Sequence, residues 1–315
     1  MDGRSAGLNQ RDIIDAALAW RGTKMALATV VFTWGSAPRP TGSHLLVSAS
    51  DGFVGSVSGG CVEGDILHLA VEILHGAPPA LRHYGVPDGR AWEVGLPCGG
   101  EIEVLVQPVG DQGFAPSLFD RVAQALDRRA TSIVATDLAS GQSECVERAD
   151  PKRFTNVYLP PRRMLIVGAV DIAQFLATIA RAVGFAVTII DPRPMFLTAE
   201  RFPGCALDDR WPDEAVVALA PDGETAVVTL SHDVKIDDPA LAAALRSRAG
   251  YVAALGSARS HLARLERLGA LGFDAAALSR IEGPAGVPIG AKGSAEIALS
   301  IASGAVAAFR RVPAA

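Results

Sequence analysis

The first half of the chain alternates short apolar runs with turn-forming residues. Apolar residues at positions 13, 14, 17, 18 and 20 recur at helical spacing and predict a helix over 12–21, and a β-branched strand follows over 26–33. Further elements are expected as strands over 44–48, 53–57, 81–84, 102–109 and 131–137, and as helices over 65–75 and 116–129. This order predicts a mixed α+β domain.

The second half follows a more regular pattern. It begins after the segment 150–163, which holds three prolines and shows little periodicity. The expected order is strand 164–167, helix 172–183, strand 186–190, strand 225–230, helix 239–247, strand 251–255, helix 258–268 and a closing helix 295–309. Apolar strands that alternate with amphipathic helices predict a parallel sheet covered on both faces. We therefore predict an α/β protein with an N-terminal mixed α+β domain over 1–158 and a Rossmann-like parallel-sheet domain over 159–315.

Composition and charge narrow the class of protein. The 315 residues suffice for two hydrophobic cores, and a net charge of −5 without any Lys/Arg block argues against a nucleic-acid partner. No apolar stretch is long enough to span a membrane, and the polar segment 1–10 does not resemble a signal peptide. Four cysteines in a chain of this size do not make a disulfide framework, so we expect reduced thiols and a cytoplasmic location.

A glycine-bearing turn follows the first strand of the second half. A dinucleotide-binding turn has the pattern G-x-G-x-x-G/A, and this chain keeps Gly168 and the tolerated Ala173 but has Val170 at the second glycine. That glycine lets the backbone approach a pyrophosphate closely, whereas valine is β-branched and stiff. Ordinary binding of NAD(P) is therefore not expected.

Polar residues follow the other strands of the same predicted sheet. Asp191 lies 23 positions after Gly168, where a ribose-binding acid is expected, and Arg193 beside it suits an anion. Open α/β sheets bind ligands outside the carboxyl ends of their strands. The alternative is that Asp191 only caps a turn, and that the strand-end histidine bonds a carbonyl. The other candidate binding residues at this edge are His232, Asp233, Gly256 and Ser257.

Two cysteines of the first half stand beside glycines. Cys61 follows Gly59 and Gly60 just ahead of a helix, and Cys98 precedes a glycine pair ahead of a strand. A thiol at a helix N-terminus becomes a better nucleophile or soft ligand, although a buried structural thiol is the commoner case. A hydrolase would need a positioned Ser-His-Asp or Cys-His pair, and we assign no catalytic residue.

Several multi-residue blocks occur together in one order, over about residues 12–311. They are GSAPRPTG at 35–42, GSVSGGCVEG at 55–64, CGGEIEV at 98–104, DPR at 191–193, HD at 232–233, YVAALGS at 251–257, GA at 290–291 and AEIALSI at 295–301. In these blocks the chain resembles the xanthine dehydrogenase accessory family, XdhC/CoxI. Family members commonly keep a second glycine in the first turn, whereas this chain has Val170 followed by Asp171.

The resemblance implies an accessory chaperone and not an enzyme. Such a protein binds the molybdenum cofactor (molybdopterin) transiently, assists its sulfuration with a cysteine desulfurase, and delivers it to a xanthine dehydrogenase-like molybdoenzyme. It also implies a homodimer, with Cys61 near the molybdenum and no metal site made by protein ligands alone. Two alternatives stay open: an NAD(P)-dependent oxidoreductase, suggested by the fold class, and a ligand-free regulatory paralogue, suggested by Val170.

Overall fold

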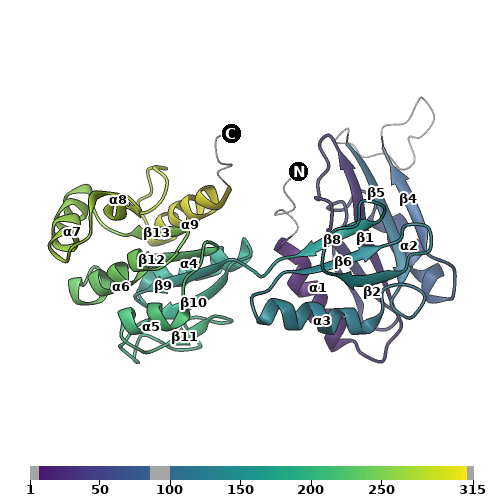
Figure 1. Ribbon diagram of the computed structural model, residues 1–315, viewed down its shortest axis with the longest axis horizontal. Coiled ribbons are helices and arrows are strands. Elements are labelled where there is room, and N and C mark those ends of the chain that lie inside the picture. The colour runs from purple at the N-terminus through teal and green to yellow at the C-terminus, as the bar shows by residue number, and fades with distance from the viewer. Residues whose placement is uncertain (1–6, 86–99, 311–315) are drawn as a thin grey trace. The chain divides into compact units, whose positions relative to one another are not determined.

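The computed structural model describes residues 7–85 and 100–310 (Figure 1). Its internal contacts divide the chain into two compact units, Met1–Pro161 and Arg162–Ala315. Met1–Pro161 is unit 1, and Arg162–Ala315 is unit 2.

Unit 1 contains a five-stranded antiparallel sheet in the order β3-β2-β1-β5-β4. The central strand β1 pairs with β2 on one side and with β5 on the other, where a bulge shifts the register between Val30 and Phe32. The bounds of the elements in this part are α1 Gly7–Ala19, β1 Met25–Trp34, β2 His44–Ser48, β3 Gly52–Gly55, α2 Glu63–Leu74, β4 Ala80–Tyr84 and β5 Glu101–Pro108.

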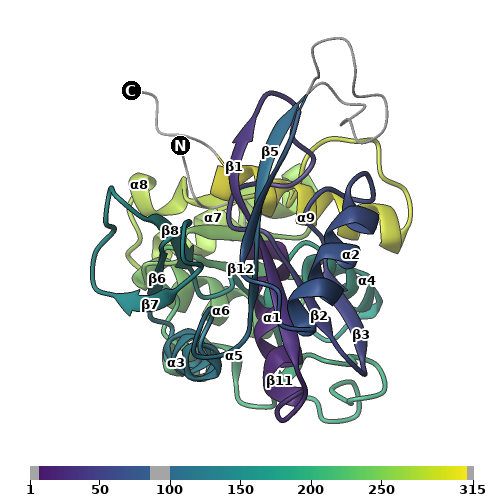
Figure 2. The same cartoon turned by 90° about the vertical axis from the view of Figure 1, so that its right-hand side faces the viewer.

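Helices cover both faces of this sheet because side chains alternate along its strands. Ala26, Ala28 and Val30 of β1 pack against α2, while Met25 and Leu27 pack against α1 and α3 on the opposite face. Figure 2 shows α2 and α3 on the two sides of β1 and β5. The loop that leads into α2 therefore belongs to a different face of the sheet from the pair α1 and α3.

A second, three-stranded antiparallel sheet completes unit 1, in the order β7-β6-β8. Its elements follow helix α3, and their bounds are α3 Pro116–Asp127, β6 Ser132–Thr136, β7 Ser143–Val146 and β8 Phe154–Tyr158. Strand β8 lies inside the segment 150–163, for which the sequence analysis predicted no element. This strand has no strict alternation of apolar and polar residues, because the polar side chain of Asn156 is one of its buried positions.

Strand β8 also explains a buried histidine. His44 is fully enclosed, with Nδ1 2.9 Å from the Thr29 hydroxyl and Nε2 2.9 Å from the Asn156 amide nitrogen and 3.0 Å from the Tyr158 hydroxyl. Burial lowers the pKa of His44 to about 4, so the ring is neutral at pH 7. His44 is therefore a structural link between the two sheets.

Unit 2 is built on a six-stranded sheet in the order β11-β10-β9-β12-β13-β14, with every neighbouring pair parallel. In order of the chain this is 3-2-1-4-5-6, the order of dinucleotide-binding folds. Its strands are β9 Arg163–Val167, β10 Ala186–Ile190, β11 Ala206–Asp208, β12 Thr225–Thr229, β13 Tyr251–Ala254 and β14 Ile281–Glu282. The parallel sheet confirms the predicted fold class.

The helices of unit 2 cover both faces of this sheet. They are α4 Asp171–Ala182, α5 Pro212–Leu219, α6 Val234–Arg246, α7 Ala258–Ala270, α8 Ala275–Leu278 and α9 Ser294–Arg310. Met164 and Ile166 of β9 pack against α4 and α9, whereas Leu165 and Val167 pack against α5 and α6 on the other face. Strand order reverses between β9 and β12, and in such sheets the crevice for a ligand lies at the carboxyl ends of these two strands.

Three differences from the predicted elements of unit 2 have local causes. Helix α6 begins at Val234, five residues before the predicted start, because Pro239 lies inside the helix and does not begin it. Strands β11 and β14 have only three and two residues, too few for a periodic signal. Helix α5 was not predicted either, because its eight residues also give too short a periodic signal. Among the described residues, no helix is long and apolar enough to cross a membrane.

Candidate functional site

In unit 1, the loop before α2 is organised by one carboxylate. Glu63, the first residue of α2, accepts hydrogen bonds from the backbone N–H groups of Val57 (3.2 Å), Ser58 (2.8 Å), Gly59 (3.0 Å) and Gly60 (2.7 Å), and from the hydroxyls of Ser56 (2.6 Å) and Ser58. Partial burial opposes its ionisation, but these donors outweigh burial and lower the pKa of Glu63 to about 2. The N–H and hydroxyl groups of the loop thus converge on the Glu63 carboxylate, which holds the loop in place.

Cys61 lies at the exposed tip of this loop. Gly59 and Gly60 have φ values of +78° and +121°, a region that favours glycine, and open space surrounds the place where a Cβ on Gly60 would be. The structure therefore places the thiol just before a helix, as predicted. The first turn of α2 also contains Glu63 and Asp65, whose negative charges oppose the positive potential of the helix end.

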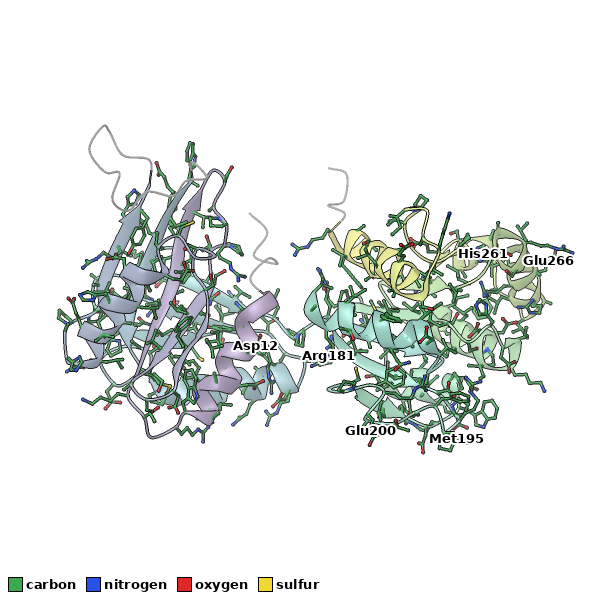
Figure 3. The ribbon with its side chains drawn as sticks, turned by 180° about the vertical axis from the view of Figure 1, so that it is seen from behind. Asp12, Arg181, Met195, Glu200, His261 and Glu266 are labelled. Carbon is green, nitrogen blue, oxygen red and sulfur yellow. The ribbon has the colours of Figure 1, made fainter. Side chains whose placement is uncertain are left out.

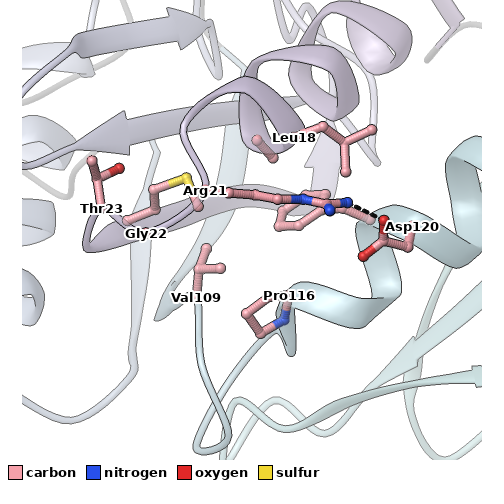
Figure 4. A pocket seen from close by; sticks show the side chains of 10 residues that line it. Leu18, Arg21, Gly22, Thr23, Val109, Pro116 and Asp120 are labelled. Atoms are coloured by element: carbon pink, nitrogen blue, oxygen red, sulfur yellow. Dashed lines mark hydrogen bonds and ion pairs between the residues drawn. The ribbon is translucent and has the colours of Figure 1, made fainter.

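Two other features of unit 1 do not add to this loop. Cys98 lies outside the described residues. A pocket of about 250 Å³ opens between α1 and α3, where Arg21 forms an ion pair with Asp120 (Figure 4). Because α1 and α3 pack on the face of the sheet opposite α2, this pocket is not continuous with the Cys61 loop.

In unit 2, the first strand-to-helix turn is filled by groups of the chain itself. Gly168 has φ +101°, and a Cβ there would lie 2.9 Å from the backbone nitrogen of Ser231 at the end of β12. The N–H of Ala169 donates to Asp191 at 2.7 Å. Val170 packs against the hydrophobic core, and Asp171 places a carboxylate in the first turn of α4. These groups leave few donors for a phosphate here.

Asp191 and Arg193 are bound to each other. The Asp191 carboxylate is fully buried and accepts from the Arg193 backbone N–H at 3.0 Å, from Nε at 2.9 Å and from Nη2 at 2.8 Å, in addition to Ala169. Burial opposes ionisation, but the Arg193 guanidinium and these N–H groups lower the pKa of Asp191. The guanidinium also lies 4.7 Å from the Phe196 ring centroid. In this arrangement Asp191 holds the turn, and contact with a ligand hydroxyl requires Arg193 to move.

The end of β12 is held by an acid that the sequence analysis did not select. His232 is exposed with φ +61°, and Asp233 caps α6 by accepting from the Lys235 N–H at 2.9 Å. The structure records no hydrogen bond between the His232 and Asp233 side chains, both of which it describes. Instead, buried Asp237 accepts from the Ser231 hydroxyl at 2.6 Å and from the His232 N–H at 3.1 Å. Burial is the main cause that raises the pKa of Asp237.

The turn after β13 differs from the two turns above because a buried arginine, and not a carboxylate, lies beneath it. Ser257 caps α7 in a reciprocal box, in which its hydroxyl accepts from the Ser260 N–H at 3.2 Å and its own N–H donates to the Ser260 hydroxyl at 2.8 Å. Gly256 has φ +145°. Beneath this turn lies the buried side chain of Arg264, which donates to the Leu255 carbonyl at 2.8 Å. A cation therefore lies below the Gly256 turn.

The structure thus gathers the predicted residues of unit 2 at one sheet edge. Ser231 approaches Gly168, and the charge of Asp233 acts on Arg193. The charge of Asp237 acts on Arg264, which links the β12 end to the β13 turn. Sequence reasoning missed Glu63, Asp237 and Arg264. Glu63 carried a usable signal, since an acid three residues after a glycine pair at a helix start is well placed to accept backbone N–H groups.

Family models match both halves of the chain. Residues 18–85 match the model described as the XdhC and CoxI family, and residues 164–304 match the model described as the XdhC Rossmann domain. The first of these ranges includes the Glu63 loop, and the second includes all of the candidate binding residues of unit 2.

Individual proteins resemble the chain over most of its length. The molybdenum cofactor insertion chaperone PaoD of Escherichia coli (strain K12) is 28% identical over 300 residues, which cover 92% of this chain and 85% of that protein. A protein of Bacillus subtilis (strain 168), named as a probable xanthine dehydrogenase subunit, is 25% identical, over 96% and 98% of the two chains.

A solved structure shares the fold. The crystal structure described as a xanthine dehydrogenase from Bacillus halodurans superposes with a TM-score of 0.81 at 24% identity, over 95% of both chains. At this identity the likeness shows the arrangement of elements alone. The two family models lead to one assignment: the chain belongs to the XdhC and CoxI family.

Proposed function

We propose that this protein is a molybdenum cofactor chaperone, which binds the cofactor transiently and inserts it into a xanthine dehydrogenase-like molybdoenzyme. The observation that carries the proposal is the match over 92% of the chain to a relative named as a molybdenum cofactor insertion chaperone. The family membership supports the same class of function. A cysteine desulfurase as the source of sulfur, a homodimer and a cytoplasmic location complete the proposal.

The Cys61 loop is proposed to meet the molybdenum end of the cargo. Thiolates are soft ligands that suit soft or sulfur-bound metals, and Cys61 is exposed at the tip of a loop whose glycines leave room beside it. Glu63 fixes the loop backbone, and Cys61 stays exposed. Cys98 belongs to the same proposed site through the family's CGGEIEV block.

The sheet edge of unit 2 is proposed to meet the phosphate end. Gly168, Asp191, Arg193, His232, Asp233, Gly256 and Ser257 remain the predicted binding residues. The order 3-2-1-4-5-6 would also suit a nicotinamide oxidoreductase, but Asp191 is enclosed and Val170 stands at the second glycine position. These two features weigh against an ordinary dinucleotide.

Transfer of the cofactor tests the proposal. An apo form of a xanthine dehydrogenase-like enzyme is incubated with molybdenum cofactor, with and without this protein, and enzyme activity is followed. We expect the protein to raise the activated fraction, and Cys61→Ala to lower that gain several-fold with an unchanged melting temperature. Cys205→Ala is the matched control, since Cys205 is half-buried in unit 2 and should have no effect. Equal activation with and without the unmodified protein would refute the proposal.

A further inference from the structure

The turn between β13 and α7 differs from the other helix starts of unit 2. Helix α7 has 13 residues, and its first turn contains no acid. The other helices of eight or more residues in unit 2 each have one or two acids there, namely Asp171, Asp213 with Glu214, Asp237 and Glu296. Helix geometry leaves the N–H groups of Ala258 and Arg259 without an intrahelical partner, and both residues are exposed.

Arg264 supplies a second and independent observation. Its side chain is buried (4% exposed), and its Nη2 lies 3.7 Å from the position that a Cβ on Gly256 would take. Nε and Nη1 of this guanidinium have no hydrogen-bond partner among the described residues. Nδ1 of His261, a residue of α7 that Figure 3 labels, is also buried and has no hydrogen-bond partner among the described residues. Among the described residues the Leu255 carbonyl is the one acceptor of the Arg264 guanidinium, so its charge lies beneath the turn without a carboxylate partner.

Two acids lie near Arg264, namely Asp237 and Asp238, and both carboxylates accept hydrogen bonds from other residues. Asp237 accepts hydrogen bonds from Ser231 and His232 at the end of β12. Asp238 pairs with Arg267 at 2.6 Å and 3.0 Å. Neither carboxylate forms a hydrogen bond with the Arg264 guanidinium among those the structure describes. Arg264 therefore places a positive charge beneath the Gly256 turn that is not hydrogen-bonded to either acid among the described residues.

We propose that this turn is the phosphate subsite of unit 2. The phosphoryl group lies at the N-terminus of α7, where the N–H groups of Ala258 and Arg259 donate to its oxygens, and Arg264 supplies a fixed charge below. The assignment of this phosphate to the molybdenum cofactor rests on the proposed function. The binding of a phosphoryl group at this turn does not, and it can be tested alone.

The first turn of the same sheet is the competing location. There the Ala169 N–H already donates to Asp191, and the Asp171 carboxylate would repel a phosphate. The two turns lie at the same sheet edge and differ in the sign of the charge at the helix start. This difference gives a matched pair of variants.

Titration with inorganic pyrophosphate at low ionic strength, followed by calorimetry, decides between the turns. We expect saturable binding that Ala258→Glu weakens at least tenfold, since the new carboxylate repels the anion while it favours the helix start. Arg264→Met should weaken binding to a similar extent, and Asp171→Asn should change it less than twofold. If Arg264→Met fails to fold, Ala258→Glu still gives the answer.

The opposite results overturn the subsite. These are no saturable binding of pyrophosphate, or unchanged binding by Ala258→Glu together with stronger binding by Asp171→Asn. Either result would leave cofactor transfer to the apoenzyme to be judged separately, because that assay contains the cofactor and its client. Failure of the subsite and failure of the chaperone function are thus distinguishable.

Discussion

Two of the glycine-bearing turns that lead into helices, one in each unit, are filled by a carboxylate of the chain. In unit 1, Glu63 accepts from the turn that it immediately follows, and Cys61 stays exposed. In unit 2, Asp191 comes from the next strand, accepts from Ala169 and Arg193, and is fully buried. The comparison shows that glycines before a helix predict a cluster of N–H donors, but do not predict what occupies them.

The carboxylates of Glu63 and Asp191 therefore have different structural roles. The Glu63 carboxylate organises a local loop in which Cys61 stays exposed. The Asp191 carboxylate joins the ends of β9 and β10 and closes that place to solvent. A ligand of unit 2 is therefore expected at a turn that no carboxylate fills, such as the one before α7.

Removal of the Glu63 charge should have the largest effect. Glu63→Gln loses one of two acceptor oxygens and turns an amide toward N–H donors, so we expect a loss of about 2–3 kcal/mol in the free energy of unfolding. Cofactor transfer should fall as it does for Cys61→Ala, because the loop that presents the thiol loosens. Urea denaturation measures the first effect. Glu72→Gln, on the exposed side of α2, is the control and should be nearly neutral.

The same carboxylate gives a pH dependence of known sign. The pKa of Glu63 is about 2 in the folded protein and near 4.5 in the unfolded chain. Its stabilisation is therefore complete above pH 4.5 and is lost as the pH falls toward 2. The stability difference between unmodified protein and Glu63→Gln should shrink over this window, and a constant difference would contradict the assigned role.

Arg193→Ala should have the next largest effect. It removes the guanidinium from a buried carboxylate, while the N–H groups of Ala169 and residue 193 remain, and we expect a loss of about 1–2 kcal/mol. Arg210 provides a matched control, because it binds Asp208 with the same two-residue spacing at a more exposed place. Arg210→Ala should cost less than about 1 kcal/mol. Equal losses from the two variants, measured by urea denaturation, would mean that burial of Asp191 adds nothing.

The sequence predicted the sheet of unit 2 because its strands are continuous apolar runs that any parallel, doubly covered sheet requires. It did not predict β8, whose burial depends on the pairing of Asn156 and Tyr158 with His44, more than 100 residues away. It also did not select Arg264, because an arginine in an amphipathic helix normally faces solvent. Only the fold shows that this position faces inward.

For the predicted binding residues, the sequence indicates where the backbone places them better than it indicates which side chains they contact. Gly168 lies in the first strand-to-helix turn, where the sequence places it, and the approach of Ser231 leaves no room for a Cβ there. The hydrogen-bond partners of a side chain could not be predicted where several acceptors lie near the same N–H donors. The sequence places Asp191 and Arg193 at a strand end, but it does not show that they bind each other.

Parallel titrations of the unmodified protein with molybdenum cofactor and with NADH distinguish a cofactor chaperone from a nicotinamide oxidoreductase. We expect saturable binding of the cofactor at micromolar concentration, and binding of NADH no tighter than about millimolar, worth about 4 kcal/mol. Val170→Gly should improve NADH binding only slightly, because Asp171 and the engaged Ala169 N–H remain. Micromolar binding of NADH, with none of the cofactor, would contradict the chaperone assignment and favour an oxidoreductase.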